Sequence, residues 1–409
     1  MRFLYTLCIQ SFACVIKFAS PFYRKAKLWN AGKKDIFYLL ENKCYGKENI
    51  VWFHCASLGE FEQGKPLMEK LKQEEKNVSL LLSFFSPSGF EVKKNDPIAD
   101  IITYLPADTP KNAKKFIQIV KPQKVFFIKY EYWYNYMYEL SKSNIPFYYV
   151  SAIFRTHQYF FKSYGKWFLQ HLKKCTHFFV QNEESKTILF QHGLSKVTVT
   201  GDTRFDSVYA TAHQSFSLDF ITSYKSDKKL IVAGSTWLPD EKLLSELFPN
   251  INTDYKLIIA PHLVEKNHIE KIIKLFSSFS VVCFSEKNNK NLANAEVLII
   301  DTIGLLRKIY KYADVSYIGG AFKTGLHNIL EAAVFEKPIF FGTHYQKFKE
   351  AIELIERGGA FSIIKANDMA QKLFEFSKNQ ILYKNVCDIC KKYVADNLGA
   401  TEKIWDSLL

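Results

Sequence analysis

The chain has 409 residues, more than one ordinary hydrophobic core supports, so its length predicts two or three domains. Its composition, with 48% hydrophobic and 23% charged residues, is typical of a globular protein and excludes a largely disordered one. The net charge of +14 favours an anionic partner: nucleic acid, an anionic membrane or a phosphorylated substrate. Because the basic residues are spread along the chain and no recognised nucleic-acid-binding motif is present, we do not expect nucleic acid.

The N-terminus carries an apolar stretch, Phe3–Ile16, followed by the basic residues Lys17, Arg24, Lys25 and Lys27. It lacks the small-residue cleavage site of a signal peptide and is shorter than the roughly 20 apolar residues that span a bilayer. Residues 1–28 therefore predict a membrane-associated helix, lying in the interface or forming a marginal anchor, with basic residues on anionic phospholipid headgroups. The alternative is an ordinary buried first helix.

From Ile50 onward, short β-branched or aromatic runs alternate with segments of helical period, which predicts parallel sheets wrapped by crossover helices. The expected strands of the first half are 50–54, 78–83, 124–128, 147–150, 178–180 and 197–200, and those of the second half are 230–233, 257–260, 281–284, 297–300, 315–318 and 339–341. We therefore expect an α/β protein of two Rossmann-like, doubly wound domains of about six strands each, facing a central crevice. The predicted boundaries are 29–206 for the first domain, 207–229 for a linker and 230–409 for the second domain.

Two segments of the first half place a carboxylate just after a predicted strand. Ser57, Gly59 and Glu60 follow the first strand, where Glu60 opens a helix and the helix dipole stabilises its charge. Glu131 and Trp133 follow the strand 124–128, at the start of a predicted helix over 131–143. Taken alone, either carboxylate is also what an ordinary helix start contains.

The second half has three polar segments after strands. Ser235 and Thr236 offer hydroxyl and backbone N–H groups to a phosphate, and His262 follows the next strand. The strongest segment is Gly319–Ala333, in which glycines let the backbone approach a ligand and a helix start near His327 presents N–H groups to an anion. The proposed ligand contacts in it are Gly319, Gly320, Gly325, His327, Asn328 and Glu331, the last at a reach suited to ribose hydroxyls.

The sequence has no Asp-x-Asp pair to hold a divalent ion against a diphosphate, no Walker loop and no HExxH. Of the eight Cys, only Cys387 and Cys390 are closely spaced, and they have no second pair to complete a zinc site. We therefore expect no metal and no cofactor, and a monophosphate rather than a diphosphate leaving group.

With these motifs in order, the chain resembles the 3-deoxy-D-manno-octulosonic acid (Kdo) transferases that act on lipid A precursors. Trp52–Glu60 is similar to their WxHxxSxGE segment, Tyr130–Trp133 to ETELWP, and Gly201–Asp206 to GNxKFD. Ala233–Thr236 is similar to AxST, and Gly319–Ala333 to GGSxxxxGGHNxLEPA. The likeness runs from the apolar N-terminus through residue 361.

The resemblance implies a GT-B architecture, a CMP-Kdo donor and a phosphorylated lipid A precursor (lipid IVA) as acceptor at the cytoplasmic face of the bacterial inner membrane. It implies that Glu60 is the general base and that Glu131 supports it, with Ser57, Gly59 and Trp133 on the acceptor side. The implied donor contacts are Arg204, Ser235, Thr236, His262, Gly319, Gly320, Gly325, His327, Asn328 and Glu331. The implied reaction is an inverting glycosyl transfer without a metal.

The chain departs from the family pattern at four places. Lys129 replaces the first Glu of ETELWP, and Tyr134 replaces its Pro. Trp237 stands where a His is common, and where the family typically reads PRHxER the segment 261–266 reads PHLVEK and lacks the Arg expected near His262. The alternatives are another GT-B enzyme using a UDP-sugar, either a hexosyl transferase or a nucleotide-sugar 2-epimerase, and a catalytically silent protein that binds the membrane surface.

Overall fold

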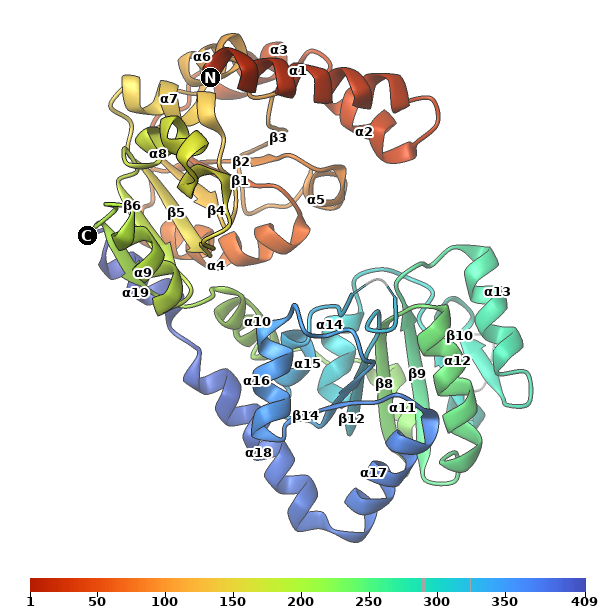
Figure 1. Ribbon diagram of the computed structural model, residues 1–409. Coiled ribbons are helices and arrows are strands. Elements are labelled where there is room, and N and C mark those ends of the chain that lie inside the picture. The colour runs from red at the N-terminus through yellow and green to blue at the C-terminus, as the bar shows by residue number, and fades with distance from the viewer. Residues whose placement is uncertain (288–291, 324) are drawn as a thin grey trace. The chain divides into compact units, whose positions relative to one another are not determined.

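The computed structural model describes residues 1–287, 292–323 and 325–409 (Figure 1). Contacts divide the chain into two compact units, Met1–Ser207 with Leu398–Leu409, and Val208–Asn397. Residues 208–229, expected as a linker, belong to the second unit and include helix α11 (Asp219–Lys225). The last twelve residues, expected in the second domain, lie with the first unit.

The first unit is built on a parallel sheet of seven strands in the order β3-β2-β1-β4-β5-β6-β7. The strands are β1 (Ile50–Cys55), β2 (Ser79–Phe84), β3 (Ile101–Tyr104), β4 (Lys124–Ile128), β5 (Phe147–Ala152), β6 (His177–Val180) and β7 (Val197–Val199). The helices are α1 (Arg2–Ala19), α2 (Arg24–Gly32), α3 (Ile36–Cys44), α4 (Leu58–Glu74), α5 (Pro87–Lys93), α6 (Pro110–Val120), α7 (Tyr134–Lys142), α8 (Lys166–Leu172), α9 (Glu183–Gln191) and α19 (Ala400–Asp406). Helix α10 (Arg204–Ala212) crosses the boundary between the units.

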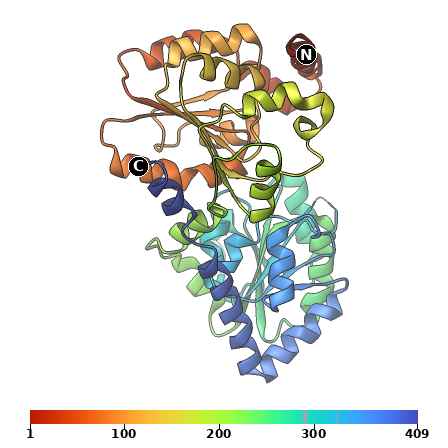
Figure 2. The same ribbon diagram turned by 60° about the vertical axis from the view of Figure 1, so that its left-hand side comes forward.

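The second unit also has a parallel sheet of seven strands, in the order β10-β11-β9-β8-β12-β13-β14. The strands are β8 (Lys229–Thr236), β9 (Tyr255–Pro261), β10 (Val281–Cys283), β11 (Val297–Ile299), β12 (Val315–Ile318), β13 (Ile339–Phe341) and β14 (Ala360–Ser362). Besides α11, the helices are α12 (Leu238–Leu247), α13 (Lys266–Leu275), α14 (Leu306–Ile309), α15 (Leu330–Ala333), α16 (Lys349–Arg357), α17 (Ala366–Lys378) and α18 (Gln380–Asp396). Helices cover both faces of each sheet (Figure 2).

Both sheets confirm the doubly wound α/β fold and correct its strand count from six to seven. The sequence predicts neither β3 nor β14, which are edge strands of four and three residues. They pair with β2 and with β13, respectively.

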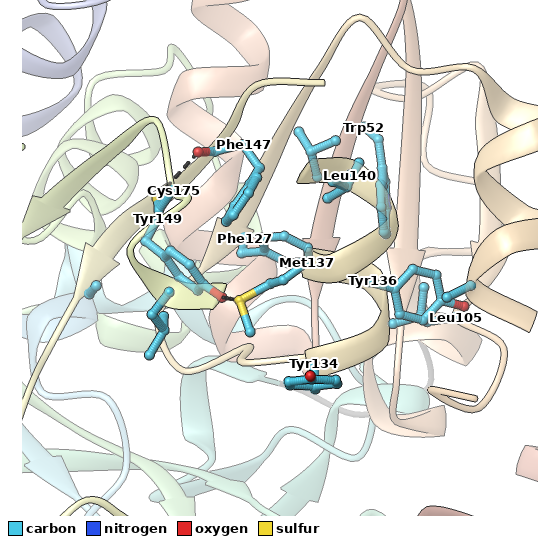
Figure 3. Close-up of a cluster of buried hydrophobic side chains, with 14 of the residues drawn as sticks. Trp52, Leu105, Phe127, Tyr134, Tyr136, Met137, Leu140, Phe147, Tyr149 and Cys175 are labelled. Atoms are coloured by element: carbon cyan, nitrogen blue, oxygen red, sulfur yellow. Dashed lines mark hydrogen bonds between the residues drawn. The ribbon is translucent and has the colours of Figure 1, made fainter. Parts of the chain in front are cut away.

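The core of the first unit is dominated by aromatic side chains (Figure 3). Strand β1 is buried along its whole length, as expected for a parallel strand covered by helices on both faces. The Trp52 ring packs against Phe127 at a centroid distance of 5.5 Å, and Phe127 stacks on Tyr149 at 5.5 Å. The Tyr149 hydroxyl lies 3.2 Å from the Met137 sulfur, which ties α7 to the sheet.

Helix α1 contacts the first unit through its first turns, and its later turns also touch the unit through the stacked rings of Phe12 and Phe85 and a hydrogen bond from Asn30 to the Ile16 carbonyl. The Tyr5 hydroxyl donates to the buried Asp108 carboxylate at 2.6 Å, and the Arg2 guanidinium donates to Asn135 at 2.9 Å. No residue of α1 is buried, and Phe3 and Phe18 are 76% and 81% exposed. Within the described part of the chain, α1 is the helix long and apolar enough to cross a membrane. This exposure contradicts the alternative of a buried first helix.

Candidate functional site

Both sheets have a topological switch point, the place where successive connections leave in opposite directions. In the first unit it lies between β1 and β4, and in the second between β8 and β12. Ligands of open α/β sheets bind outside the carboxyl ends of the strands at such a point. Most residues singled out in the sequence lie at the ends of these four strands: Ser235 and Thr236 are the last residues of β8, and the others follow β1, β4 or β12. His262 follows β9, and Arg204 follows β7.

Glu60 lies in the first turn of α4, directly after β1. Its buried carboxylate accepts hydrogen bonds from the backbone N–H groups of Ala56 and Ser57. Burial, and then the negative charge of Glu131, raises the pKa of Glu60 to about 8, although the Ala56 hydrogen bond and the charge of Lys129 act in the opposite direction. A carboxyl group with this pKa can take up a proton near neutral pH, which is what a general base requires.

Gly59 precedes Glu60 in the first turn of α4. An added Cβ at Gly59 would meet nothing closer than the Ser57 hydroxyl at 3.9 Å. The absent side chain leaves open space beside Glu60. The Ser57 side chain makes no capping hydrogen bond, so α4 is capped by the Glu60 carboxylate.

Glu131 is held by two ring N–H groups at the end of β4. The His54 Nε2 and Trp133 Nε1 atoms lie 2.9 and 2.8 Å from the same Glu131 oxygen. The buried His54 is bonded through Nδ1 to the Ser83 hydroxyl at 2.8 Å. The sequence does not reveal this chain of hydrogen bonds, because Ser83 comes from β2 and meets His54 only when β1 and β2 pair.

The segment around Glu131 is a loop, and not the helix over 131–143 that the sequence predicts. Helix α7 begins at Tyr134, and Lys129 has a left-handed backbone with φ of 65° directly after β4. Such a backbone is costly for a residue with a side chain and is frequent at functional sites. The turn lets the chain leave the sheet and present Glu131 toward His54.

Arg204 is engaged within the first unit. Its guanidinium contacts the buried Asp202 carboxylate at 2.8 Å from Nε and 2.7 Å from a terminal nitrogen. Burial raises the pKa of Asp202, but the charge of Arg204 and three hydrogen bonds outweigh it, so the net pKa lies below the ordinary value. Asp206 accepts hydrogen bonds from the backbone of Gly399 and from the backbone and hydroxyl of Thr401. The Gly201–Asp206 segment thus attaches the C-terminal helix α19 to the first unit.

In the second unit, the loop after β12 closes tightly on β8. A Cβ at Gly319 would lie 2.4 Å from the Ser235 carbonyl oxygen, so only glycine fits there. Ser235 itself is left-handed with φ of 55°. The Gly320 N–H, expected to face an anion, donates to the buried Asp240 carboxylate at 2.9 Å. The Gly325 N–H donates to the Gly320 carbonyl at 3.0 Å.

The helix expected near His327 begins at Leu330 and has four residues, α15. The Leu330 N–H is capped by the Asn328 side chain at 3.2 Å. Glu331, expected at a ribose, accepts from the Arg307 guanidinium at 2.8 Å and from the Asn328 amide at 3.3 Å. Arg307 comes from α14, and its pairing with Glu331 gives no sequence signal. Thr324, within the same segment, lies outside the described residues.

Three rings stack where β8, β9 and β12 end. The His262 ring lies 4.7 Å from Trp237 and 4.6 Å from His327, at interplanar angles of 23° and 26°. The Trp237 N–H donates to His327 Nε2 at 3.1 Å. Burial, and then the charge of His262, lowers the pKa of His327 to about 4. Trp237, a departure from the expected His, is therefore part of the site.

The described parts of both units contain no group of three or more His, Cys, Asp or Glu side chains placed to hold a metal ion. Thr236 is buried, and its hydroxyl donates to the buried Glu241 carboxylate at 3.0 Å.

Comparison with solved structures shows the class of the fold. The chain matches a putative UDP-N-acetylglucosamine 2-epimerase from Listeria monocytogenes with a TM-score of 0.60 and 14% identity, over 88% of this chain and 96% of that chain. The UDP-GlcNAc 2-epimerase from Neisseria meningitidis matches with a TM-score of 0.61 and 15% identity, over 88% and 99%. At these identities the likeness concerns the fold, which is GT-B-like.

The sequence comparisons show the family. Residues 31–207 match the family model described as 3-deoxy-D-manno-octulosonic-acid transferase (kdotransferase). The 3-deoxy-D-manno-octulosonic acid transferase of Aquifex aeolicus is 27% identical over 337 residues, or 80% of this chain and 86% of that protein. The Haemophilus influenzae protein of that name is 25% identical over 378 residues, or 88% and 86%. The chain belongs to the Kdo transferase family of glycosyltransferases.

A third relative is longer than this chain. The bifunctional glycosyltransferase/methyltransferase of Fusobacterium nucleatum is 26% identical over 339 residues, which are 80% of this chain but 52% of that protein. The chain thus spans about half the length of that relative.

Proposed function

We propose that the protein transfers Kdo from CMP-Kdo to a hydroxyl group of a phosphorylated, acylated glucosamine disaccharide, the lipid A precursor lipid IVA. The observation that carries this proposal is the pair Glu60 and Glu131, which flanks the β1/β4 switch point inside the segment matched by the family model. Two relatives that this chain covers over 86% of their length are named 3-deoxy-D-manno-octulosonic acid transferase, which supports the proposal that Kdo is the transferred sugar.

In the proposed reaction, Glu60 takes the proton of the acceptor hydroxyl as that oxygen attacks the anomeric carbon of Kdo. The bond from this carbon to the CMP phosphate breaks, CMP leaves with the bonding electrons, and the configuration inverts. Proton transfer of this kind typically contributes about 10²–10⁴-fold to the rate. Glu131 is positioned by His54 and Trp133, and its negative charge raises the affinity of Glu60 for the proton.

We place the donor at the switch point of the second unit. Ser235, Thr236, His262 and His327 are the proposed donor contacts there, with Gly319 and Gly320 shaping the loop. Arg307 carries positive charge for the phosphate, although it also contacts a carboxylate. A monophosphate leaving group needs less neutralisation than a diphosphate, and we propose that the transfer proceeds without a metal ion.

We further propose that α1 holds the enzyme on the cytoplasmic face of the inner membrane, where its lipid acceptor resides. The exposed apolar side chains of α1 and the basic residues after it support an interfacial position. Replacing Phe3 and Phe18 with Ser should release the protein from sedimented anionic vesicles. Undiminished binding of this variant would contradict the role of α1.

The direct test is turnover of Glu60→Gln with CMP-Kdo and lipid IVA, with added sugars counted by mass spectrometry. We expect at least a 100-fold loss of kcat with little change in the donor KM. Glu69→Gln, on the same helix and 41% exposed in its side chain, is the matched control and should be fully active. Near-normal turnover of Glu60→Gln would contradict the role of Glu60 as general base. A wild-type enzyme that uses UDP-N-acetylglucosamine but not CMP-Kdo would contradict the proposal that CMP-Kdo is the donor.

A further inference from the structure

A cavity of about 580 Å³ lies in the first unit, beside the helices of the N-terminus. Its lining residues come from α1, the end of α2, the start of α3, the loop before α6 and the first turn of α6. Figure 1 labels these helices. This volume suits a small organic ligand or a sugar phosphate. Lys17 of α1 lines the cavity, and the next residue, Phe18, is strongly exposed. The cavity therefore lies close to the surface of α1 that we propose faces the membrane.

Lys33, which lines this cavity, has a buried amine without a hydrogen-bond partner in the described part of the chain. Its Nζ lies 3.5 Å from the centre of the Trp29 ring and 5.1 Å from that of Phe85. Burial lowers the pKa of Lys33 well below its ordinary value. An ammonium group has three donors, and leaving them all unpaired in an apolar wall is costly unless a ligand accepts them.

The charges around the cavity favour an anion. Lys17 and Lys33 line it together with one carboxylate, Asp35, while Cys14 and Tyr38 are the remaining titratable side chains. Two amines against one carboxylate give the wall a net positive charge once a bound anion keeps Lys33 protonated. A phosphate group offers oxygens for charge-assisted hydrogen bonds to such amines.

The cavity is also connected to the catalytic groups through two aromatic rings. Phe85, which contacts the Lys33 amine, packs on Trp133 at a centroid distance of 5.0 Å. Trp133 in turn donates to Glu131. Phe85 follows β2 and Trp133 follows β4, so a ligand in the cavity lies near the edge of the sheet formed by the carboxyl ends of its strands.

We propose that this cavity binds a phosphate group of the lipid acceptor, with Lys33 as its principal cation. The inference rests on the proposed function, since it takes the acceptor to be a phosphorylated glycolipid. Binding the phosphate here places the acceptor sugars toward Glu60 and supplies the Lys33 ammonium with the acceptor oxygens that it lacks. Lys33 is thus a residue that selects phosphorylated acceptors.

The test measures acceptor binding in the absence of CMP-Kdo, so it does not depend on transfer. Affinities for a diphosphorylated acylated glucosamine disaccharide, and for the same lipid after phosphatase treatment, are determined in detergent micelles by microscale thermophoresis. We expect the wild-type protein to prefer the phosphorylated lipid at least tenfold. Lys33→Met should abolish the preference, Lys33→Arg should retain most of it, and Lys34→Met, at an exposed neighbouring position, should leave it intact.

An unchanged preference in Lys33→Met overturns the proposal. Equal competition by phosphatidic acid, or displacement of the lipid by millimolar inorganic phosphate, also overturns the assignment to the acceptor. If the wild-type protein shows the Lys33-dependent preference but transfers no Kdo, the phosphate site stands and the proposed function fails. If it transfers Kdo but the preference does not depend on Lys33, the proposed function stands and the site fails.

Discussion

Replacing Lys129 with Met and Glu131 with Gln is expected to move the pH dependence of the reaction in opposite directions. As a general base, Glu60 must be ionised, so kcat/KM rises with pH through the pKa of Glu60, which is raised to about 8. The positive charge of Lys129 favours the ionised form of Glu60, and the negative charge of Glu131 opposes it. A unit charge acting across about 6–10 Å at an effective dielectric constant of about 20 is worth roughly 2–3 kcal/mol, or about 1–2 pH units.

We therefore expect the rising limb of kcat/KM to shift by about 1–2 units to higher pH in Lys129→Met, and by a similar amount to lower pH in Glu131→Gln. The Gln oxygen still accepts from His54 and Trp133, so the hydrogen-bonded loop is kept. The profiles are measured from pH 5.5 to 10 with subsaturating CMP-Kdo at fixed ionic strength. Limbs that coincide with the wild type, or two shifts of the same sign, would refute the role of Glu60 as the titrating base.

Three further outcomes follow from particular contacts. Lys33→Met should stabilise the first unit by about 1–3 kcal/mol, because it removes a buried unpaired amine. This gain should grow as the pH falls, because Lys33 binds a proton more readily in the unfolded chain than in the folded one; thermal unfolding from pH 6 to 10 measures it. Trp237→Phe should raise the donor KM about tenfold with a smaller effect on kcat, because the ring remains but the N–H to His327 is lost; steady-state kinetics with CMP-Kdo tests this. Asp206→Ala should lower the free energy of unfolding by about 1–2 kcal/mol and expose residues after 398 to limited proteolysis, because three hydrogen bonds to Gly399 and Thr401 are lost. Unchanged cleavage would contradict that attachment.

The fold was largely predictable from the sequence because buried parallel strands have short, continuous runs of apolar residues. Strand β4 has the predicted bounds, 124–128, and is buried from Val125 onward. The edge strands β3 and β14 were not predicted, although the edge strands β7 and β10, which are as short as β14, were. The return of α19 to the first unit was not predicted either, because it depends on Asp206, almost 200 residues earlier in the chain.

The candidate site was predictable to the extent that it follows strand ends. Glu60, Glu131 and Ser235 are visible in the sequence because each comes just after a predicted strand, and the topology then places them at switch points. The partners that set their chemistry are distant in sequence and carry no local signal. Glu131 meets His54 across 77 positions, and Gly320 meets Asp240 across 80.

The stack of Trp237, His262 and His327 bears on how the donor phosphate is held. Because the Trp237 N–H donates to His327 Nε2, the neutral His327 carries its proton on Nδ1. With its pKa lowered to about 4, His327 stays neutral at physiological pH and offers a hydrogen bond rather than a charge. The positive charge for a phosphate must then come from elsewhere, and Arg307 of the same unit is already fixed by a carboxylate, Glu331. Such pairing orients a guanidinium while cancelling part of its charge, so the site suits a singly charged phosphodiester such as that of CMP-Kdo better than a more highly charged diphosphate.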